Sequence, residues 1–135
     1  MMLGIGVDSV EIKRFADWNT YSNPKLLRIF SQEEIDYCLS SPFKSAERFA
    51  LRFAAREAFF KAFCQMIPEQ KIPFLTVCKQ VAVKHAQNGP RFLDINWRGL
   101  IPAQFDLKQG TISCLSSFTH THTTATALVF LQNAS

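Results

Sequence analysis

The chain has 135 residues, of which 47% are hydrophobic, and a formal net charge of +4 at pH 7. This length predicts one domain over residues 1–135, and a core of that size leaves apolar surface that subunit association could cover. The small positive charge excludes a polycation and suits phosphate-bearing ligands or an acidic protein surface, without selecting between them.

The four cysteines lie at positions 38, 64, 78 and 114 and include no C-x-x-C pair. We therefore expect neither a zinc ribbon nor a dithiol redox motif, and the cysteines are too sparse for a secreted disulfide framework. The N-terminus carries no basic leader, and no apolar run approaches the ~20 residues of a membrane span. These observations predict a reduced, cytoplasmic protein without a membrane segment.

The first part of the chain predicts one strand followed by short helices. Residues 3–7 are apolar and contain two glycines, which indicates a buried strand where backbones approach closely. Apolar residues at helical spacing predict a helix over residues 9–18, and Asn-Pro predicts another over 23–30. The capping box Ser31-x-x-Glu34 predicts the start of a third helix.

The longest predicted helix follows Ser41-Pro42 and extends to about Phe63. Its apolar residues recur at intervals of three, four and seven, which predicts a stripe facing the core. The phenylalanines of this stripe are Phe49, Phe53, Phe60 and Phe63. A basic stripe of Arg48, Arg52 and Arg56 lies beside it.

The C-terminal half predicts strands. We expect strands over residues 76–85 and 91–97, joined by the strong hairpin signal Asn88-Gly89. Two further β-branched segments predict strands over 111–118 and 124–131. Helices first and strands afterwards, behind one leading strand, indicate an α+β domain with a mainly antiparallel sheet packed against helices.

Asp8 follows the leading strand and permits two interpretations. It could cap a helix, with Glu11 three residues later completing the capping pair. Alternatively, it could bind a metal at the end of the strand, where the preceding glycines would allow a phosphate to approach.

Glu57 and Lys61 stand one helical turn apart. Their spacing alone suits a surface ion pair. However, the neighbouring phenylalanine stripe predicts that Glu57 is partly enclosed, and an enclosed carboxylate needs a cation such as Mg²⁺ or the Lys61 ammonium.

The histidines give weaker signals. His120 and His122 would share a face in a strand, so a two-histidine metal site is conceivable, but strand-end polar residues are the more common case. His85 is expected on the surface beside the hairpin.

Three segments, in this order, resemble bacterial holo-[acyl-carrier-protein] synthases, the AcpS-type phosphopantetheinyl transferases. Residues 4–12 (GIGVDSVEI) resemble the opening pattern G-[IL]-G-x-D-[IL]-V/T-E-[IL]. Residues 52–63 (RFAAREAFFKAF) resemble the helix R-F-A-x-K-E-A-x-x-K-A-F. Residues 115–121 (LSSFTHT), followed by Ala125 and Ala127, resemble the terminal strand S-[IL]-[ST]-H-[TD]…A-x-A. The resemblance covers nearly the whole chain and is weakest over residues 67–110.

The chain departs from these patterns at a few positions. Arg56 stands where Lys is common, and Cys64 stands where the family helix normally ends in Gly. The turn at residues 88–90 lacks the family's Lys, and residues 117–118 imply a one-residue difference before His120. These differences concern peripheral coenzyme A contacts more than the catalytic centre.

The resemblance implies a phosphopantetheinyl transferase fold with one domain per subunit, and a homotrimer with active sites at subunit interfaces. The implied reaction moves 4′-phosphopantetheine from coenzyme A to a serine of apo acyl carrier protein, releases adenosine 3′,5′-bisphosphate and supports fatty acid biosynthesis. Asp8 and Glu57 would hold Mg²⁺, Glu57 would also accept the serine proton, and Lys61 would stabilise the phosphates.

The same resemblance assigns roles to further residues. His120 and Thr121 would contact the 3′-phosphate of coenzyme A from a neighbouring subunit. The basic helix residues expected near the coenzyme phosphates are Lys44, Arg48 and Arg52. Arg14, with Lys25 or Arg28, would face the acidic recognition helix of the carrier protein, in a salt-sensitive contact.

Two other functions compete with this one. A non-catalytic α+β module could bind RNA through the arginine stripe, but the phenylalanines follow core spacing instead of alternating with the basic residues. A family member that binds coenzyme A without transfer is the second, and Cys64 is the feature that keeps it open. We therefore expect neither nucleic acid nor membrane as a partner.

Overall fold

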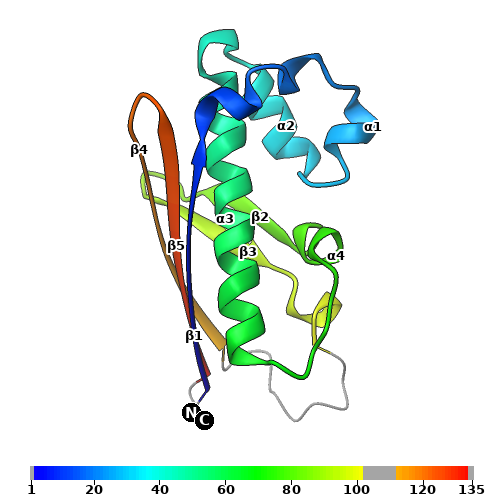
Figure 1. Ribbon diagram of the computed structural model, residues 1–135, viewed down its shortest axis with the longest axis vertical. Coiled ribbons are helices and arrows are strands. Elements are labelled where there is room, and N and C mark those ends of the chain that lie inside the picture. Colours follow the sequence, from blue (N-terminus) through cyan, green and yellow to red (C-terminus); the bar gives the residue numbers. More distant parts are fainter. Residues whose placement is uncertain (1, 102–111, 134–135) are drawn as a thin grey trace.

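The computed structural model describes residues 2–101 and 112–133, in which two antiparallel sheets pack around one long helix (Figure 1). The larger sheet has the strand order β1-β5-β4, and β2 and β3 form a separate hairpin. The strands are β1 (Met2–Glu11), β2 (Val81–His85), β3 (Arg91–Ile95), β4 (Ile112–His120) and β5 (Thr124–Asn133). The helices are α1 (Asn23–Leu26), α2 (Gln32–Leu39), α3 (Ser45–Met66) and α4 (Phe74–Cys78). The predicted α+β class with antiparallel sheets is confirmed.

Helix α3 runs the length of the molecule, with the larger sheet on one flank and α1, α2 and α4 on the other (Figure 1). Strand β1 lies directly on the backbone of α3 because two of its residues lack side chains. A Cβ at Gly4 would stand 2.0 Å from the Ala62 carbonyl oxygen, and one at Gly6 would stand 1.9 Å from that of Ala58. The predicted close approach of backbones is therefore confirmed. The helix fills the space beside these glycines, so their lack of side chains allows β1 to pack on α3.

The helix predicted over residues 9–18 is wrong. Strand β1 continues to Glu11 because it pairs with β5 along its whole length, from Met2↔Asn133 to Glu11↔Thr124. Only two 3₁₀ turns follow, Ile12–Phe15 and Trp18–Thr20. Asp8 lies within the strand opposite Ala127, so it caps no helix.

The remaining element predictions differ mainly in their bounds. The Ser31 capping box is confirmed, since Ser31 Oγ accepts from the Glu34 N–H (3.2 Å) and the Glu34 carboxylate accepts from the Ser31 N–H (2.9 Å). Helix α3 begins after a 3₁₀ turn at Pro42–Lys44. The strand expected from residue 76 begins only at Val81, because α4 occupies Phe74–Cys78. The strand predicted from residue 111 is β4, whose first expected residue lies outside the described ranges.

Helix α3 is buried on almost every side, and two of its three arginines are buried as well. Arg52 and Arg56 are 1% and 0% exposed. Arg56 pairs with the buried Glu34 carboxylate at 2.5 and 2.9 Å, and it also donates to the Val81 carbonyl (2.7 Å). The arginine stripe is therefore not a surface for a polyanion, which removes the basis of the RNA-binding alternative.

The outer face of the larger sheet is apolar and exposed. Leu3, Ile5 and Val7 alternate along β1 and are 48%, 54% and 55% exposed. The strand register places Phe130 between Ile5 and Leu115, and it places Leu128 beside Val7. We call this set of residues the outer sheet face. Within residues 2–101 and 112–133, no helix is both long enough and apolar enough to cross a bilayer.

Candidate active site

Strand β1 and helix α3 bring Asp8, Lys61 and Glu57 together, as the sequence predicts. The Lys61 ammonium donates to Asp8 Oδ1 (3.0 Å) and to the Val7 carbonyl (3.0 Å). Asp8 keeps only 12% of its side-chain surface exposed, whereas Lys61 keeps 55%. Lys61 therefore pairs with a carboxylate on the neighbouring strand, where the spacing alone suggested Glu57.

The second oxygen of Asp8 has no partner. Asp8 Oδ2 is buried and accepts no hydrogen bond within the part of the chain that the structure describes. A buried polar atom without a partner costs about 1–3 kcal/mol, so a ligand that satisfies it is stabilising.

Glu57 behaves as one member of a carboxylate pair. Burial and the adjacent Asp8 carboxylate raise the pKa of Glu57 to about 7, although the Arg14 and Lys61 charges oppose the shift. Two neighbouring carboxylates repel each other when both are ionised, so the pair favours either a shared proton or a bound cation.

The pair suits a hard cation that takes few protein ligands. Within residues 2–101 and 112–133, no group of three or more His, Cys, Asp and Glu side chains could enclose a metal ion. Mg²⁺ is commonly bound by one or two carboxylates, with water and substrate phosphates completing its octahedral shell. Asp8 Oδ2 and the Glu57 carboxylate therefore fit Mg²⁺, and a site closed by protein ligands alone is excluded for these residues.

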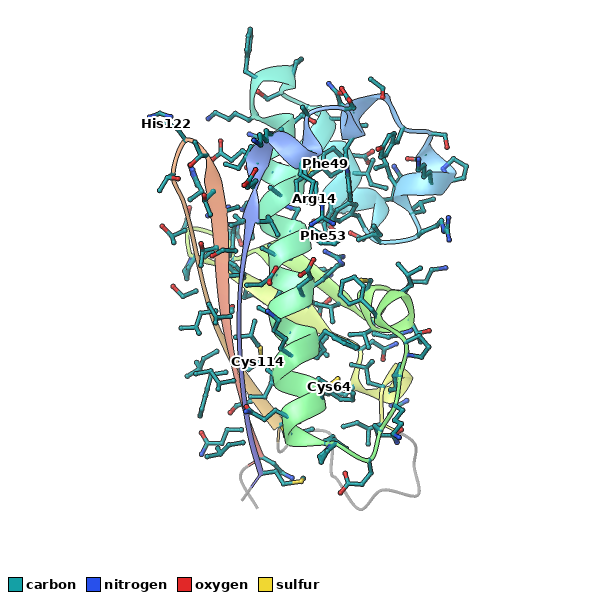
Figure 2. The ribbon with its side chains drawn as sticks, in the orientation of Figure 1. Arg14, Phe49, Phe53, Cys64, Cys114 and His122 are labelled. Carbon is teal, nitrogen blue, oxygen red and sulfur yellow. The ribbon has the colours of Figure 1, made fainter. Side chains whose placement is uncertain are left out.

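His120 and Thr121 lie at the opposite edge of the sheet from Asp8. His120 ends β4, which is separated from β1 by β5, and its Nε2 lies 2.5 Å from Glu47 Oε1 at the start of α3. The Thr121 hydroxyl accepts from the Thr123 and Thr124 N–H groups and closes the β4–β5 turn. His122, in that turn (Figure 2), does not share a strand face with His120, so the two-histidine arrangement is not formed.

The predicted coenzyme-binding cations have very different surroundings. Lys44 is exposed, whereas Arg48 donates to the Tyr37 carbonyl (2.8 Å) and Ser40 Oγ (3.0 Å). Arg52 is buried and lies 3.1 Å from His85 Nε2. In this arrangement Arg52 does not present its guanidinium to solvent, which speaks against the predicted contact with coenzyme phosphates.

Two of the cations assigned to carrier binding lie over aromatic rings. Arg14 stacks on Phe53 with its guanidinium carbon 4.9 Å from the ring centroid (Figure 2), and Lys25 lies 3.8 Å above the Tyr21 ring. Lys25 and Arg28 also line a cavity of about 340 Å³, whose remaining lining residues are Trp18, Tyr21, Leu26, Ile29 and Leu75. The sequence indicates the cations but not this apolar cavity, because the cavity forms only where Leu75 of α4 lies against residues 18–29.

A second cavity adjoins the carboxylate pair. It measures about 320 Å³ and is lined by Phe53, Glu57, Phe60, Lys61 and Phe74. The spacing in α3 identified Phe60 only as a core residue, and nothing in the sequence singled out Phe74.

Comparisons with known proteins identify the family of this chain. Residues 4–98 match the model of the 4′-phosphopantetheinyl transferase superfamily. Two relatives are the holo-[acyl-carrier-protein] synthases of Treponema denticola, 36% identical over 98% of this chain and 99% of the relative, and Trichlorobacter lovleyi, 37% identical over 98% of both chains. The structure of the Chronobacterium ammoniagenes ACPS–CoA complex matches all of both chains with a TM-score of 0.75 and 26% identity. The structure of holo-[acyl-carrier-protein] synthase from Neisseria meningitidis matches 98% of this chain and 100% of its own, with a TM-score of 0.71 and 26% identity. The chain thus belongs to the holo-[acyl-carrier-protein] synthases of the 4′-phosphopantetheinyl transferase superfamily.

Proposed function

We propose that this chain transfers 4′-phosphopantetheine from coenzyme A to a serine of an apo acyl carrier protein, in support of fatty acid biosynthesis. The observation that carries the proposal is the carboxylate pair on β1 and α3, in which Asp8 Oδ2 lacks a partner and Lys61 holds the other oxygen. Phosphoryl transfer depends on positioning and on charge stabilisation around the phosphate, and these groups provide both.

Asp8 and Glu57 would hold Mg²⁺, and the bound ion would neutralise the charge of the pyrophosphate of coenzyme A. Lys61 is anchored by Asp8 and remains half-exposed, so its ammonium reaches a phosphate oxygen beside the pair and stabilises the leaving group. Glu57 would also accept the proton of the serine hydroxyl as the general base.

The carrier protein would dock on the surface of Arg14, Lys25 and Arg28. Lys25 and Arg28 line the apolar cavity together with Trp18, Tyr21 and Leu75, so an acidic helix with one protruding apolar side chain is complementary to both features. Arg14 stacks on Phe53, which also lines the cavity beside Glu57, so this surface continues into the catalytic centre.

Subunits would associate through the outer sheet face and form a homotrimer. An exposed apolar strip on adjacent strands is the usual sign of a protein interface. His120 and Thr121 lie on the edge of the sheet away from their own Asp8, which is where a residue must lie to act at a neighbouring subunit's site. The trimer and the shared site both follow from the resemblance, and the apolar face supports them.

Mass spectrometry of the carrier tests the activity. The protein is incubated with apo carrier protein, coenzyme A and Mg²⁺, and the carrier should gain the mass of one phosphopantetheine group. Asp8→Asn and Glu57→Gln should each abolish the gain while thermal unfolding stays cooperative. Glu69→Gln, at an exposed position after α3, is the matched control and should behave as the wild type. A folded wild-type protein that leaves a cognate carrier unchanged contradicts the proposal, and would favour a chain that binds coenzyme A without transfer.

A further inference from the structure

The cavity beside Glu57 and Lys61 has one charged side and one aromatic side. Glu57 and Lys61 stand one turn apart on α3 and form the charged side. The Lys61 ammonium lies 3.0 Å from Asp8 Oδ1, so Asp8 adjoins this side of the cavity. Phe53, Phe60 and Phe74 form the other side, with the Phe74 ring centroid 5.4 Å from that of Phe60 and 5.9 Å from that of Phe53. The catalytic groups thus adjoin a preformed apolar wall.

The aromatic wall packs against the core but is only partly enclosed by it. Phe53 is buried and packs against Phe15 and Trp18, but Phe60 and Phe74 are only partly buried and keep their outer surfaces open. At about 320 Å³, the cavity lies near the lower end of the roughly 300–1,000 Å³ typical of small-molecule sites. Open aromatic surface of this kind gains free energy when an apolar group covers it.

The proposed substrate carries an apolar group at the matching place. In coenzyme A, the phosphate that is transferred is esterified to a methylene, and the next carbon bears two methyl groups. If that phosphate lies at Asp8, Glu57 and Lys61, the methyl-bearing carbon lies only two bonds beyond the ester oxygen. The aromatic wall is the apolar surface of the cavity that lies within this short distance of the charged side, so the two methyl groups would lie against it.

We propose that Phe60 and Phe74, supported by Phe53, form the subsite that binds the dimethyl end of the phosphopantetheine arm. This inference rests on the proposed function and deepens it by naming the part of the substrate that the cavity recognises. The subsite would fix the rotation of the arm about its phosphate ester, so binding energy away from the reacting atoms would help to orient the phosphate. The competing occupant is an apolar side chain of the carrier protein next to the reacting serine.

The test compares two ligands that differ by the whole phosphopantetheine group, that is, by the arm together with its phosphate. Binding of coenzyme A and of adenosine 3′,5′-bisphosphate is measured by titration calorimetry in Mg²⁺ buffer, for the wild type and for Phe60→Ala and Phe74→Ala. Each variant should bind coenzyme A roughly tenfold more weakly, the loss expected when two methyl groups lose their apolar cover, with affinity for the bisphosphate unchanged. Phe60→Leu, which keeps apolar cover, should recover most of the affinity. Leu39→Ala, at an exposed apolar position at the end of α2, is the matched control and should bind both ligands as the wild type does.

Either of two results overturns the subsite. Equal weakening of both ligands would show that the phenylalanines support the fold of the site and do not recognise the arm. Unchanged affinity for coenzyme A, together with a raised KM for the carrier, would assign the cavity to the carrier side chain. Both results require a wild-type protein that binds coenzyme A and modifies the carrier, so they are distinct from failure of the proposed function.

Discussion

The buried ion pair between Glu34 and Arg56 gives the sharpest prediction of stability. Both oxygens of Glu34 accept hydrogen bonds: Oε1 from the Ser31 N–H (2.9 Å) and Arg56 Nη2 (2.5 Å), and Oε2 from Arg56 Nη1 (2.9 Å) and the Val83 N–H (3.0 Å). Glu34→Gln keeps the shape of the side chain but replaces one acceptor with an NH₂ donor. Whichever way the amide is turned, its NH₂ group faces two N–H donors, one from Arg56 and one from the main chain.

The magnitude follows from these contacts. Two hydrogen bonds at about 1–1.5 kcal/mol each are lost, and a fully buried guanidinium is left without its counter-charge. Removing one partner of a buried pair costs about 3–5 kcal/mol, so Glu34→Gln should lose about that much of the total unfolding free energy, which is about 5–15 kcal/mol for a domain.

Urea denaturation measures the loss, with the slope of the transition checked for two-state behaviour. Glu33→Gln, at the exposed neighbouring position in the same helical turn, should stay within about 0.5 kcal/mol of the wild type. Glu34→Leu combined with Arg56→Met removes both charges and should be more stable than Glu34→Gln. A Glu34→Gln protein within about 1 kcal/mol of the wild type would refute the reasoning.

Three further predictions concern other features. Gly6→Ala places a methyl group against the Ala58 carbonyl oxygen and should cost about 1–3 kcal/mol or more of unfolding free energy. Gly89→Ala, in the exposed hairpin turn, should cost far less. Equal losses of stability in thermal unfolding would contradict the close contact of β1 and α3. Ile5→Lys on the outer sheet face should yield monomers by light scattering, while Phe92→Lys, at an exposed apolar position on β3, should leave the wild-type assembly. Identical sizes for all three proteins would exclude this face as the interface. Burial alone would raise the pKa of Glu34, but the Arg56 charge and the hydrogen bonds outweigh it and hold the pKa below its usual 4.5. The stabilisation that the ionised Glu34 provides is therefore complete above pH 4.5 and is lost as the pH falls through the lowered pKa. The difference in unfolding free energy between wild type and Glu34→Gln should narrow from pH 7 to about pH 3. A constant difference would contradict the lowered pKa.

The sequence predicts the elements with strong local signals and fails where tertiary contacts decide. The capping box at Ser31 and the Asn88-Gly89 hairpin are both local, and both are confirmed. The segment after Asp8 has apolar residues at helical spacing, but pairing with β5 extends the strand to Glu11. That pairing joins residues more than a hundred positions apart, and no local pattern reveals it.

The site follows the same division. Asp8, Glu57 and Lys61 were identified by their motif surroundings, since each residue alone suited an ordinary structural role. The ion pair of Lys61 with Asp8 could not be foreseen, because it depends on how β1 is placed on α3. Arg52 and Arg56 share the spacing of surface cations, and only the packing of α2, β2 and α4 around α3 reveals their burial.

The contact of Gly4 and Gly6 with Ala62 and Ala58 also bears on how the protein can change over evolution. The separation of the Asp8 and Glu57 carboxylates depends on this main-chain contact, since Asp8 follows these glycines and Glu57 and Lys61 immediately precede the two alanines. Side chains elsewhere in the core can therefore be exchanged for others of similar volume without altering the distance between the carboxylates. Sequence drift should be tolerated over most of the interior and forbidden at two positions that carry no side chain.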